Sequence, residues 1–118
     1  MRYRIIVFLV ITLSVAVQVH AECMNDSYGR RMCGKGQCKM SQYGKVLCAR
    51  EGGGAANNKN DNVQCGIGYC IVDDYNRVWC STIPGGKAYI DENGKIVCAG
   101  ECERGKASYC EDAKVAED

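Results

Sequence analysis

The sequence predicts a small disulfide-rich, mainly β protein: short β-hairpins in tandem, stapled by about five disulfides around little core. Three observations predict this class. The 118 residues contain ten cysteines, large apolar side chains are scarce, and one cysteine spacing recurs with turn-forming residues between the cysteines. Such a cysteine density is typical of scaffolds that disulfides stabilise.

Residues 1–21 predict a cleaved secretory signal peptide. Arg2 and Arg4 precede an apolar run over residues 5–17, and small residues flank His20 at the end of the segment. The apolar run is short for a membrane span. We therefore expect a mature chain of 118 − 21 = 97 residues without a membrane span, secreted into an oxidising extracellular compartment.

The mature chain has too few large apolar groups to fold on burial alone. It contains one leucine, Leu47, one tryptophan, Trp79, and no phenylalanine. Burial stabilises by about 25 cal/mol per Å², and a disulfide that closes a loop of about 15 residues adds roughly 3 kcal/mol. We therefore expect all these cysteines to form disulfides: Cys23, Cys33, Cys38, Cys48, Cys65, Cys70, Cys80, Cys98, Cys102 and Cys110.

The cysteine spacing predicts three hairpins. A shift of 32 residues places the segment 33–48 on the segment 65–80, with glycines after the first cysteine in both, and a reduced third copy covers residues 85–98. Strands are predicted at Tyr69–Val72 and Arg77–Cys80. Asn93-Gly94 predicts a type I′ turn, in which both central residues have positive φ. Since the side chains between the cysteines differ, the repetition indicates a scaffold and not a duplicated catalytic site.

The remaining segments complete the predicted organisation. Residues 22–48 form a first cysteine-rich hairpin unit, and residues 65–110 form a second unit that includes the third hairpin and a short helix from Ala107. Residues 49–64, rich in glycine and asparagine, predict a flexible linker, with a recognition loop as the alternative. Residues 111–118 form an acidic tail that is expected to fray.

Charge and residue types argue against several functions. The mature chain has thirteen basic and fourteen acidic side chains, which gives no electrostatic reason to bind nucleic acid or an anionic membrane. Without His20 it has no imidazole base, so we predict a protein that is not an enzyme and needs no cofactor. Adjacent carboxylates such as Asp73-Asp74 are typical of turns.

Metal binding is not predicted either. Cys33, Cys38, Cys65 and Cys70 could be drawn as a four-thiolate zinc site, but their C-x4-C spacing is wider than the usual C-x2-C. Secretion also favours oxidation of these thiols. The acidic and asparagine residues lack the spacing of a calcium loop.

Several surface residues are candidates for modification or binding. Asn25 begins an N-glycosylation sequon. Arg30 and Arg31 are a dibasic site, a protease-facing pair or simply solvated cations. Rigid aromatic side chains either cover sheet faces or form a binding surface, and Tyr43 and Tyr75, each beside a turn, are the two expected to be exposed. The aromatic set comprises Tyr28, Tyr43, Tyr69, Tyr75, Trp79, Tyr89 and Tyr109.

Two resemblances follow from the cysteine pattern. The spacing C-x4-C-x9-C, with a glycine after its first cysteine, resembles the central part of EGF-like domains, and this resemblance implies the pairs Cys23–Cys38 and Cys33–Cys48. Arg50 stands where that family has its fifth cysteine, so growth-factor and calcium-dependent properties are not implied. The layout of residues 30–110 is similar to small cysteine-rich byssal foot proteins of mussels, which implies an adhesive role for tyrosine and cysteine.

Two functions follow as hypotheses. The first is a secreted, non-enzymatic, disulfide-rich binding protein of the venom, salivary or inhibitor type, which presents hairpin loops to an extracellular protein. The alternative is a structural matrix or adhesive protein that uses cysteine and tyrosine for crosslinking or redox buffering.

Overall fold

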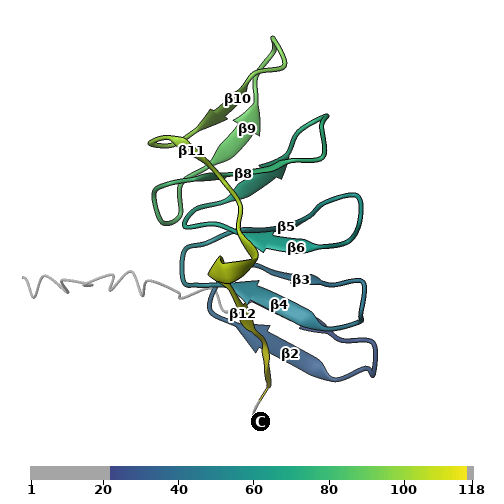
Figure 1. Cartoon of the computed structure of the whole chain (residues 1–118). Coiled ribbons are helices and arrows are strands. Elements are labelled where there is room, and N and C mark those ends of the chain that lie inside the picture. The colour runs from purple at the N-terminus through teal and green to yellow at the C-terminus, as the bar shows by residue number, and fades with distance from the viewer. Residues whose placement is uncertain (1–21, 117–118) are drawn as a thin grey trace, which may run out of the picture.

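The computed structural model describes residues 22–116 and shows five antiparallel β-hairpins stacked one on another (Figure 1). The predicted signal peptide lies outside these residues. Disulfide-rich β structure is therefore confirmed, with five successive hairpins in place of three. The hairpins are β1 (Glu22–Asn25) with β2 (Arg31–Gly34), β3 (Cys38–Met40) with β4 (Val46–Ala49), β5 (Ala55–Asn57) with β6 (Val63–Cys65), β7 (Cys70–Val72) with β8 (Val78–Ser81), and β9 (Ala88–Ile90) with β10 (Ile96–Cys98).

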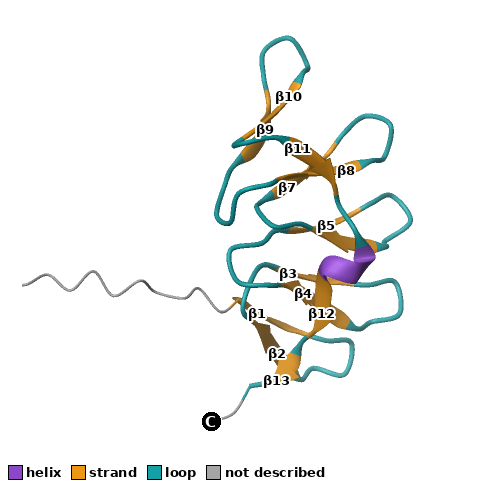
Figure 2. Cartoon of the chain, turned by 60° about the vertical axis from the view of Figure 1, so that its left-hand side comes forward, coloured by secondary structure: helices purple, strands orange, loops and turns teal. Residues whose placement is uncertain are grey.

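The chain then returns along the stack, and we call residues 102–116 the return segment. Its strand β11 (Cys102–Arg104) pairs with β8, Lys106 bridges Cys65 of β6, β12 (Cys110–Asp112) pairs with β4, and β13 (Lys114–Val115) pairs with β2. A short 3-10 helix, η1 (Ala107–Tyr109), lies between β11 and β12 (Figure 2). The return segment thus joins the first four hairpins.

Disulfides close some hairpins and tie others to the return segment. Cys23–Cys33, Cys38–Cys48 and Cys70–Cys80 each join residues that face one another across a hairpin. In β5–β6 and β9–β10 an alanine stands opposite the cysteine, and the remaining bridges, Cys65–Cys110 and Cys98–Cys102, reach the return segment. The pairs Cys23–Cys38 and Cys33–Cys48, which the EGF resemblance implies, are therefore wrong.

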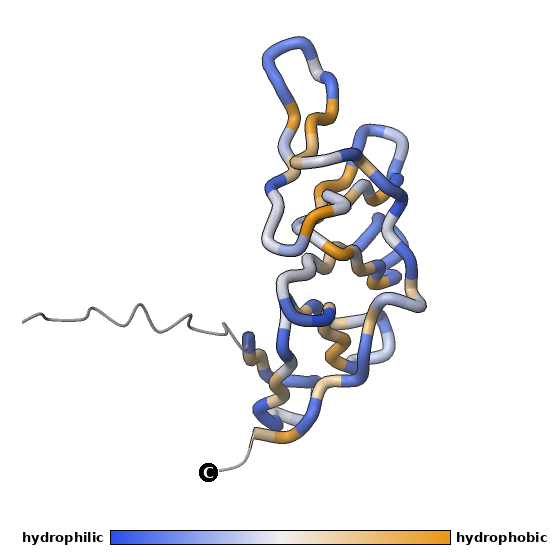
Figure 3. Tube along the Cα trace, turned by 90° about the vertical axis from the view of Figure 1, so that its left-hand side faces the viewer, coloured by the Kyte–Doolittle hydropathy of each residue, from blue (hydrophilic) through white to orange (hydrophobic). Residues whose placement is uncertain are grey.

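The core consists of small side chains and sulfur. Val46, Val63 and Val78 occupy equivalent positions in three second strands and are at most 4% exposed. Val63 and Val78 pack with disulfides and with an alanine of the neighbouring hairpin, and Val46 packs with the Cys38–Cys48 disulfide and with Met24, Met32 and Ala113. A Cβ atom added to Gly66 would lie 2.2 Å from the Cys80 Cβ, so only glycine lets the hairpins approach this closely. The hydropathy trace shows the apolar segments inside the stack and hydrophilic turns at its edge (Figure 3).

Two predicted flexible segments are ordered instead. The linker prediction for residues 49–64 is wrong, because this region contains β5 and most of β6 and buries Ala49, Ala55 and Val63. Small side chains suffice here because the hairpin is sandwiched between two others. The expectation that residues 111–118 fray is wrong for residues 111–116, since β12 and β13 pair with β4 and β2.

The type I′ turn predicted at Asn93-Gly94 is also wrong. Gly94 has a φ of 79°, but Asn93 is not among the residues with positive φ. The loop between β9 and β10 is a five-residue turn, in which the Gly94 N–H donates to the Asp91 C=O over 3.0 Å. A longer loop requires positive φ at only one position. The strand predicted at Tyr69–Val72 begins one residue later, at Cys70, and the strand predicted at Arg77–Cys80 is shifted by one residue, to Val78–Ser81.

Candidate functional site

The five hairpin turns share one five-residue construction. The side-chain oxygen at position 1 accepts a hydrogen bond from the backbone N–H of position 3 in every turn. Position 4 has positive φ in every turn, which glycine, asparagine and aspartate tolerate best. The turns are residues 26–30, 41–45, 58–62, 73–77 and 91–95, and we number them turn 1 to turn 5.

Hydrogen bonds connect neighbouring turns into a row. The Ser27 N–H in turn 1 donates to the Gly44 C=O in turn 2 over 3.2 Å, and the Gln42 N–H in turn 2 donates to the Asp61 C=O in turn 3 over 3.1 Å. The Lys59 N–H in turn 3 donates to the side-chain oxygen of Asn76 in turn 4. Turns 1 to 4 therefore lie side by side along one edge of the molecule (Figure 1).

Position 3 of the turns carries the most exposed aromatic side chains. Tyr43 and Tyr75 are 84% and 79% exposed, as the sequence predicts. Tyr28, whose exposure is not among the predictions, occupies the same position and is 83% exposed. A shared tripeptide was the signal that could have identified it, because turns 1, 2 and 4 all read Tyr, then Gly or Asn, then Lys or Arg.

In two of these turns the arginine at position 5 lies over the tyrosine ring. The Arg30 guanidinium lies 5.4 Å from the Tyr28 ring centre and pairs with Asp26 at 2.9 Å. In turn 4 the Arg77 guanidinium lies 5.0 Å from the Tyr75 ring centre and pairs with Asp73 at 2.8 Å. Each arrangement restricts the tyrosine rotamer through a cation–π contact.

The remaining predicted surface residues lie near turn 1. Arg31 is exposed in β2, one residue after Arg30, and its backbone pairs with Asn25 of β1. Because this backbone is held in a hairpin, the dibasic pair is not presented as an open loop. Asn25 is itself exposed at the end of β1, so the sequon lies on the surface.

The position 1 carboxyls are strongly hydrogen-bonded. Partial burial raises the pKa of Asp73, but hydrogen bonds from the Arg77 backbone, the Trp79 indole and the Arg77 guanidinium outweigh it and lower the pKa to about 2. In turn 1, burial of Asp26 is likewise outweighed by the N–H groups of Arg30 and Tyr28, and its pKa lies below the ordinary value. Both carboxylates therefore stay charged at neutral pH and fix their turns.

A cleft of about 450 Å³ separates turn 4 from turn 5. Aromatic side chains of the fourth hairpin form one wall, and aliphatic side chains of the fifth hairpin form the other. The cleft is lined by Asp73, Asp74, Tyr75, Arg77, Trp79, Ile90, Gly94, Ile96 and Cys102.

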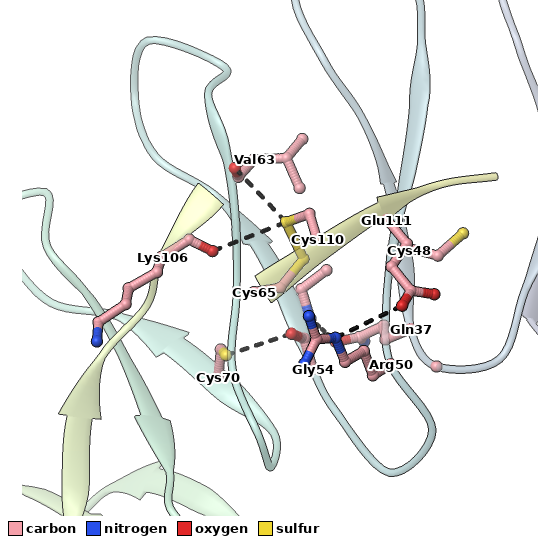
Figure 4. Close-up of a disulfide and its surroundings, with 12 residues drawn as sticks. Gln37, Cys48, Arg50, Gly54, Val63, Cys65, Cys70, Lys106, Cys110 and Glu111 are labelled. Carbon is pink, nitrogen blue, oxygen red and sulfur yellow. Dashed lines mark hydrogen bonds and ion pairs between the residues drawn. A yellow bond between two sulfur atoms is a disulfide. The ribbon is translucent and has the colours of Figure 1, made fainter. Parts of the chain in front are cut away.

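All ten cysteines lie within the described residues, and all are in disulfides. Figure 4 shows Cys65–Cys110, in which the Cys110 sulfur lies 3.8 and 4.0 Å from the carbonyl oxygens of Val63 and Lys106. The ion pair of Arg50 with Glu111 lies nearby. In residues 22–116 no three His, Cys, Asp or Glu side chains gather as a metal site. No helix in that range is long and apolar enough to cross a membrane.

Comparison with known proteins identifies no relative: no family model, curated protein or solved structure matches this chain significantly. The candidate site is therefore interpreted from its own geometry. Among the described residues, that geometry includes a rigid row of turns with three exposed tyrosines and a cleft between turns 4 and 5.

Proposed function

We propose that this chain is a secreted, non-enzymatic, disulfide-rich binding protein that presents its row of hairpin turns to an extracellular protein. The observation that supports this best is the exposure of Tyr28, Tyr43 and Tyr75 at one position of three turns. Tyrosine supplies a large contact area with few rotatable bonds and is enriched among the residues that dominate interface energies.

The rigidity of the turns favours binding. Hydrogen bonds join turns 1 to 4, and position 1 side chains hold each turn internally. Ordering loops and side chains on association opposes binding, by about 0.5–1.5 kcal/mol for each immobilised side chain. Because these turns are ordered before a partner arrives, most of that loss is avoided.

Extracellular localisation is part of the same proposal. The chain contains five disulfides. In most organisms disulfides form and persist in oxidising compartments such as the extracellular space. The predicted signal peptide of residues 1–21 would deliver the chain there. A globular partner in the extracellular space is then the expected target.

The test isolates the partner by photocrosslinking the labelled native protein to proteins of the surrounding extracellular fluid, and then measures the affinity by interferometry. Replacement of Tyr28, Tyr43 and Tyr75 together by serine should weaken binding about 30-fold or more, as expected for the loss of dominant interface residues. Tyr89→Ser is the matched control, since Tyr89 is 53% exposed but lies in β9, outside the turns. An unchanged affinity of the triple variant, or the absence of any crosslinked protein, would contradict the proposal.

An adhesive or matrix protein is the second candidate, because exposed tyrosines can also be oxidised and crosslinked. The pairing of all ten cysteines supports this alternative less, since redox buffering needs free thiols. Thiol titration of the native protein, with peptide mapping for modified tyrosine, separates the two candidates. A binding protein should show no free thiol and unmodified tyrosines, whereas an adhesive should show several free thiols or modified tyrosines.

A further inference from the structure

The row of turns is interrupted between turn 4 and turn 5. Hydrogen bonds link turn 1 to turn 2, turn 2 to turn 3 and turn 3 to turn 4, but none links turn 4 to turn 5 among the described residues. The connection before the fifth hairpin, residues 82–87, is longer than the other three connections and contains Pro84. Figure 1 shows the β9–β10 hairpin inclined away from the hairpins below it. A cleft of about 450 Å³ lies between these two turns.

The walls of the cleft are apolar and incompletely covered. Ile96 stands at the strand position where Val46, Val63 and Val78 are buried, yet Ile96 is only half-buried, and Ile90 beside it is 47% exposed. Trp79 lines the cleft from the fourth hairpin, with the Arg77 and Arg104 guanidinium groups 5.6 and 5.4 Å from its ring centre. An apolar side chain from a partner would complete the packing that the stack provides elsewhere.

The interruption also leaves two backbone groups at the cleft. Between turn 1 and turn 2 the N–H of position 2 donates to the C=O of position 4. The corresponding groups at the gap are the Asp74 N–H and the Gly94 C=O, and both residues line the cleft. A peptide unit offers one C=O and one N–H, so an extended peptide can satisfy both groups at once.

The charge at the cleft favours a cation. Asp73 is already bonded to the Arg77 guanidinium and the Trp79 indole, each over 2.8 Å. Asp74 lines the same cleft, and its carboxylate forms no ion pair with the described residues. Asp74 is therefore the carboxylate that remains for a basic side chain of a ligand.

We propose that the cleft between turns 4 and 5 binds an extended peptide segment of a partner protein. An apolar side chain of the peptide packs among Trp79, Ile90 and Ile96, its backbone bridges the Asp74 N–H and the Gly94 C=O, and a neighbouring lysine or arginine pairs with Asp74. This inference rests on the proposed binding function, because it assigns a peptide-binding site to the end of the turn row.

The test uses the fluorescence of Trp79, which is the only tryptophan of the chain. Titration with the acetylated tetrapeptide amide Gly-Leu-Lys-Gly should give a saturable change. Replacing the leucine of the peptide by serine should weaken binding about tenfold, since a buried leucine is lost. Methylating the leucine nitrogen should weaken binding several-fold, because one hydrogen bond is lost.

Variants of the protein separate the contributions of charge and of apolar packing to peptide binding. Asp74→Asn keeps the backbone N–H and should remove the preference for the lysine peptide over its glutamate analogue. Ile96→Ala should weaken binding of the leucine peptide several-fold, and the control Ile83→Ala should not, because Ile83 is exposed near the fifth hairpin but does not line the cleft. Amide NMR spectra should show the Asp74 signal shifting on titration.

Three results would overturn the inference: no fluorescence change, equal affinity for the leucine and serine peptides, or a Trp79 signal that depends on protein concentration alone, which would place a second copy in the cleft. Tyr28→Ser should leave the peptide affinity unchanged, because Tyr28 lies at the far end of the row. If the tetrapeptide fails to bind while the tyrosine-dependent partner still binds, the cleft inference is lost and the proposed function stands.

Discussion

The third and fifth hairpins differ from the second and fourth in the residue that faces the cysteine of the second strand, and this difference determines how the stack is held together. The second and fourth hairpins carry Cys38 and Cys70 opposite the cysteine of the other strand, and each closes its own disulfide. The third and fifth carry Ala55 and Ala88 there. An alanine leaves the facing cysteine without a partner in its own hairpin.

The two kinds of bridge constrain different parts of the chain. A bridge within a hairpin joins residues ten positions apart, whereas Cys65–Cys110 joins residues 45 positions apart. Loop-closure entropy increases with loop length, so the long bridge restricts the unfolded chain most. A cysteine at the facing position therefore closes a hairpin locally, and an alanine there leaves the cysteine of the second strand to bond the return segment.

The largest expected effect tests this difference directly. Removing the long bridge by Cys65→Ser with Cys110→Ser should lower the free energy of unfolding by about 4 kcal/mol, and removing a hairpin bridge by Cys38→Ser with Cys48→Ser should lower it by about 2.7 kcal/mol. Guanidinium unfolding measures both values. Equal losses, or a larger loss for the hairpin bridge, would contradict the comparison.

A substitution of Gly66 tests how closely the third hairpin packs against the Cys70–Cys80 disulfide of the fourth. Gly66→Ala should lower the free energy of unfolding by about 3 kcal/mol, because the added methyl would overlap Cys80 of the next hairpin. Gly94→Ala is the control: it has open space but a φ of 79°, and should lose about 1 kcal/mol. Thermal or denaturant unfolding of both variants provides the comparison, and an equal loss would argue against disulfide contact as the cause.

Ala55→Cys should convert the third hairpin into one that is closed by its own disulfide. The introduced cysteine faces Cys65 across the strands and should capture it, which leaves Cys110 as a free thiol. The exchange of a 45-residue loop for a ten-residue loop should lower the free energy of unfolding by about 1 kcal/mol. Thiol titration and peptide mapping give the pairing. If Cys110 stays bonded to Cys65, strand pairing does not decide the connectivity.

The smallest effect concerns acid stability in the fourth hairpin. The folded pKa of Asp73 is about 2, below the ordinary 3.8, so its stabilising contribution is present above pH 3.8 and is lost as the pH falls toward 2. Asp73→Asn should be less stable than the native protein at neutral pH and should show a flatter stability curve between pH 4 and pH 2. Asp74→Asn is the control, and an equally flat curve for it would contradict the role of Asp73.

Local signals in the sequence predicted part of the fold correctly. Cysteines with glycines and turn residues between them predicted hairpins, and residues 70–81 form one close to the predicted bounds. The linker prediction for residues 49–64 is wrong because β5 and β6 bury alanine and valine, not large apolar groups. Asn58 and Asp61, which match the turn positions of the other hairpins, were the signal that could have identified this hairpin.

Long-range features could not be predicted in the same way. Pairing of the return segment with β2, β4 and β8 depends on contacts far apart in the chain, and the acidic tail gave no local sign of it. Exposure of Tyr43 and Tyr75 followed from their place beside turns. The cleft is lined by residues of the fourth and fifth hairpins, and no local pattern in the sequence brings these residues together.

The central claim is that facing alanines direct two cysteines to the return segment. Proteolysis of the native protein without reduction, followed by mass spectrometry, tests it most directly. The account predicts peptides that link Cys65 to Cys110 and Cys98 to Cys102, with Cys23–Cys33, Cys38–Cys48 and Cys70–Cys80 each within a hairpin. A link from Cys65 or Cys98 to a cysteine of any hairpin would contradict it.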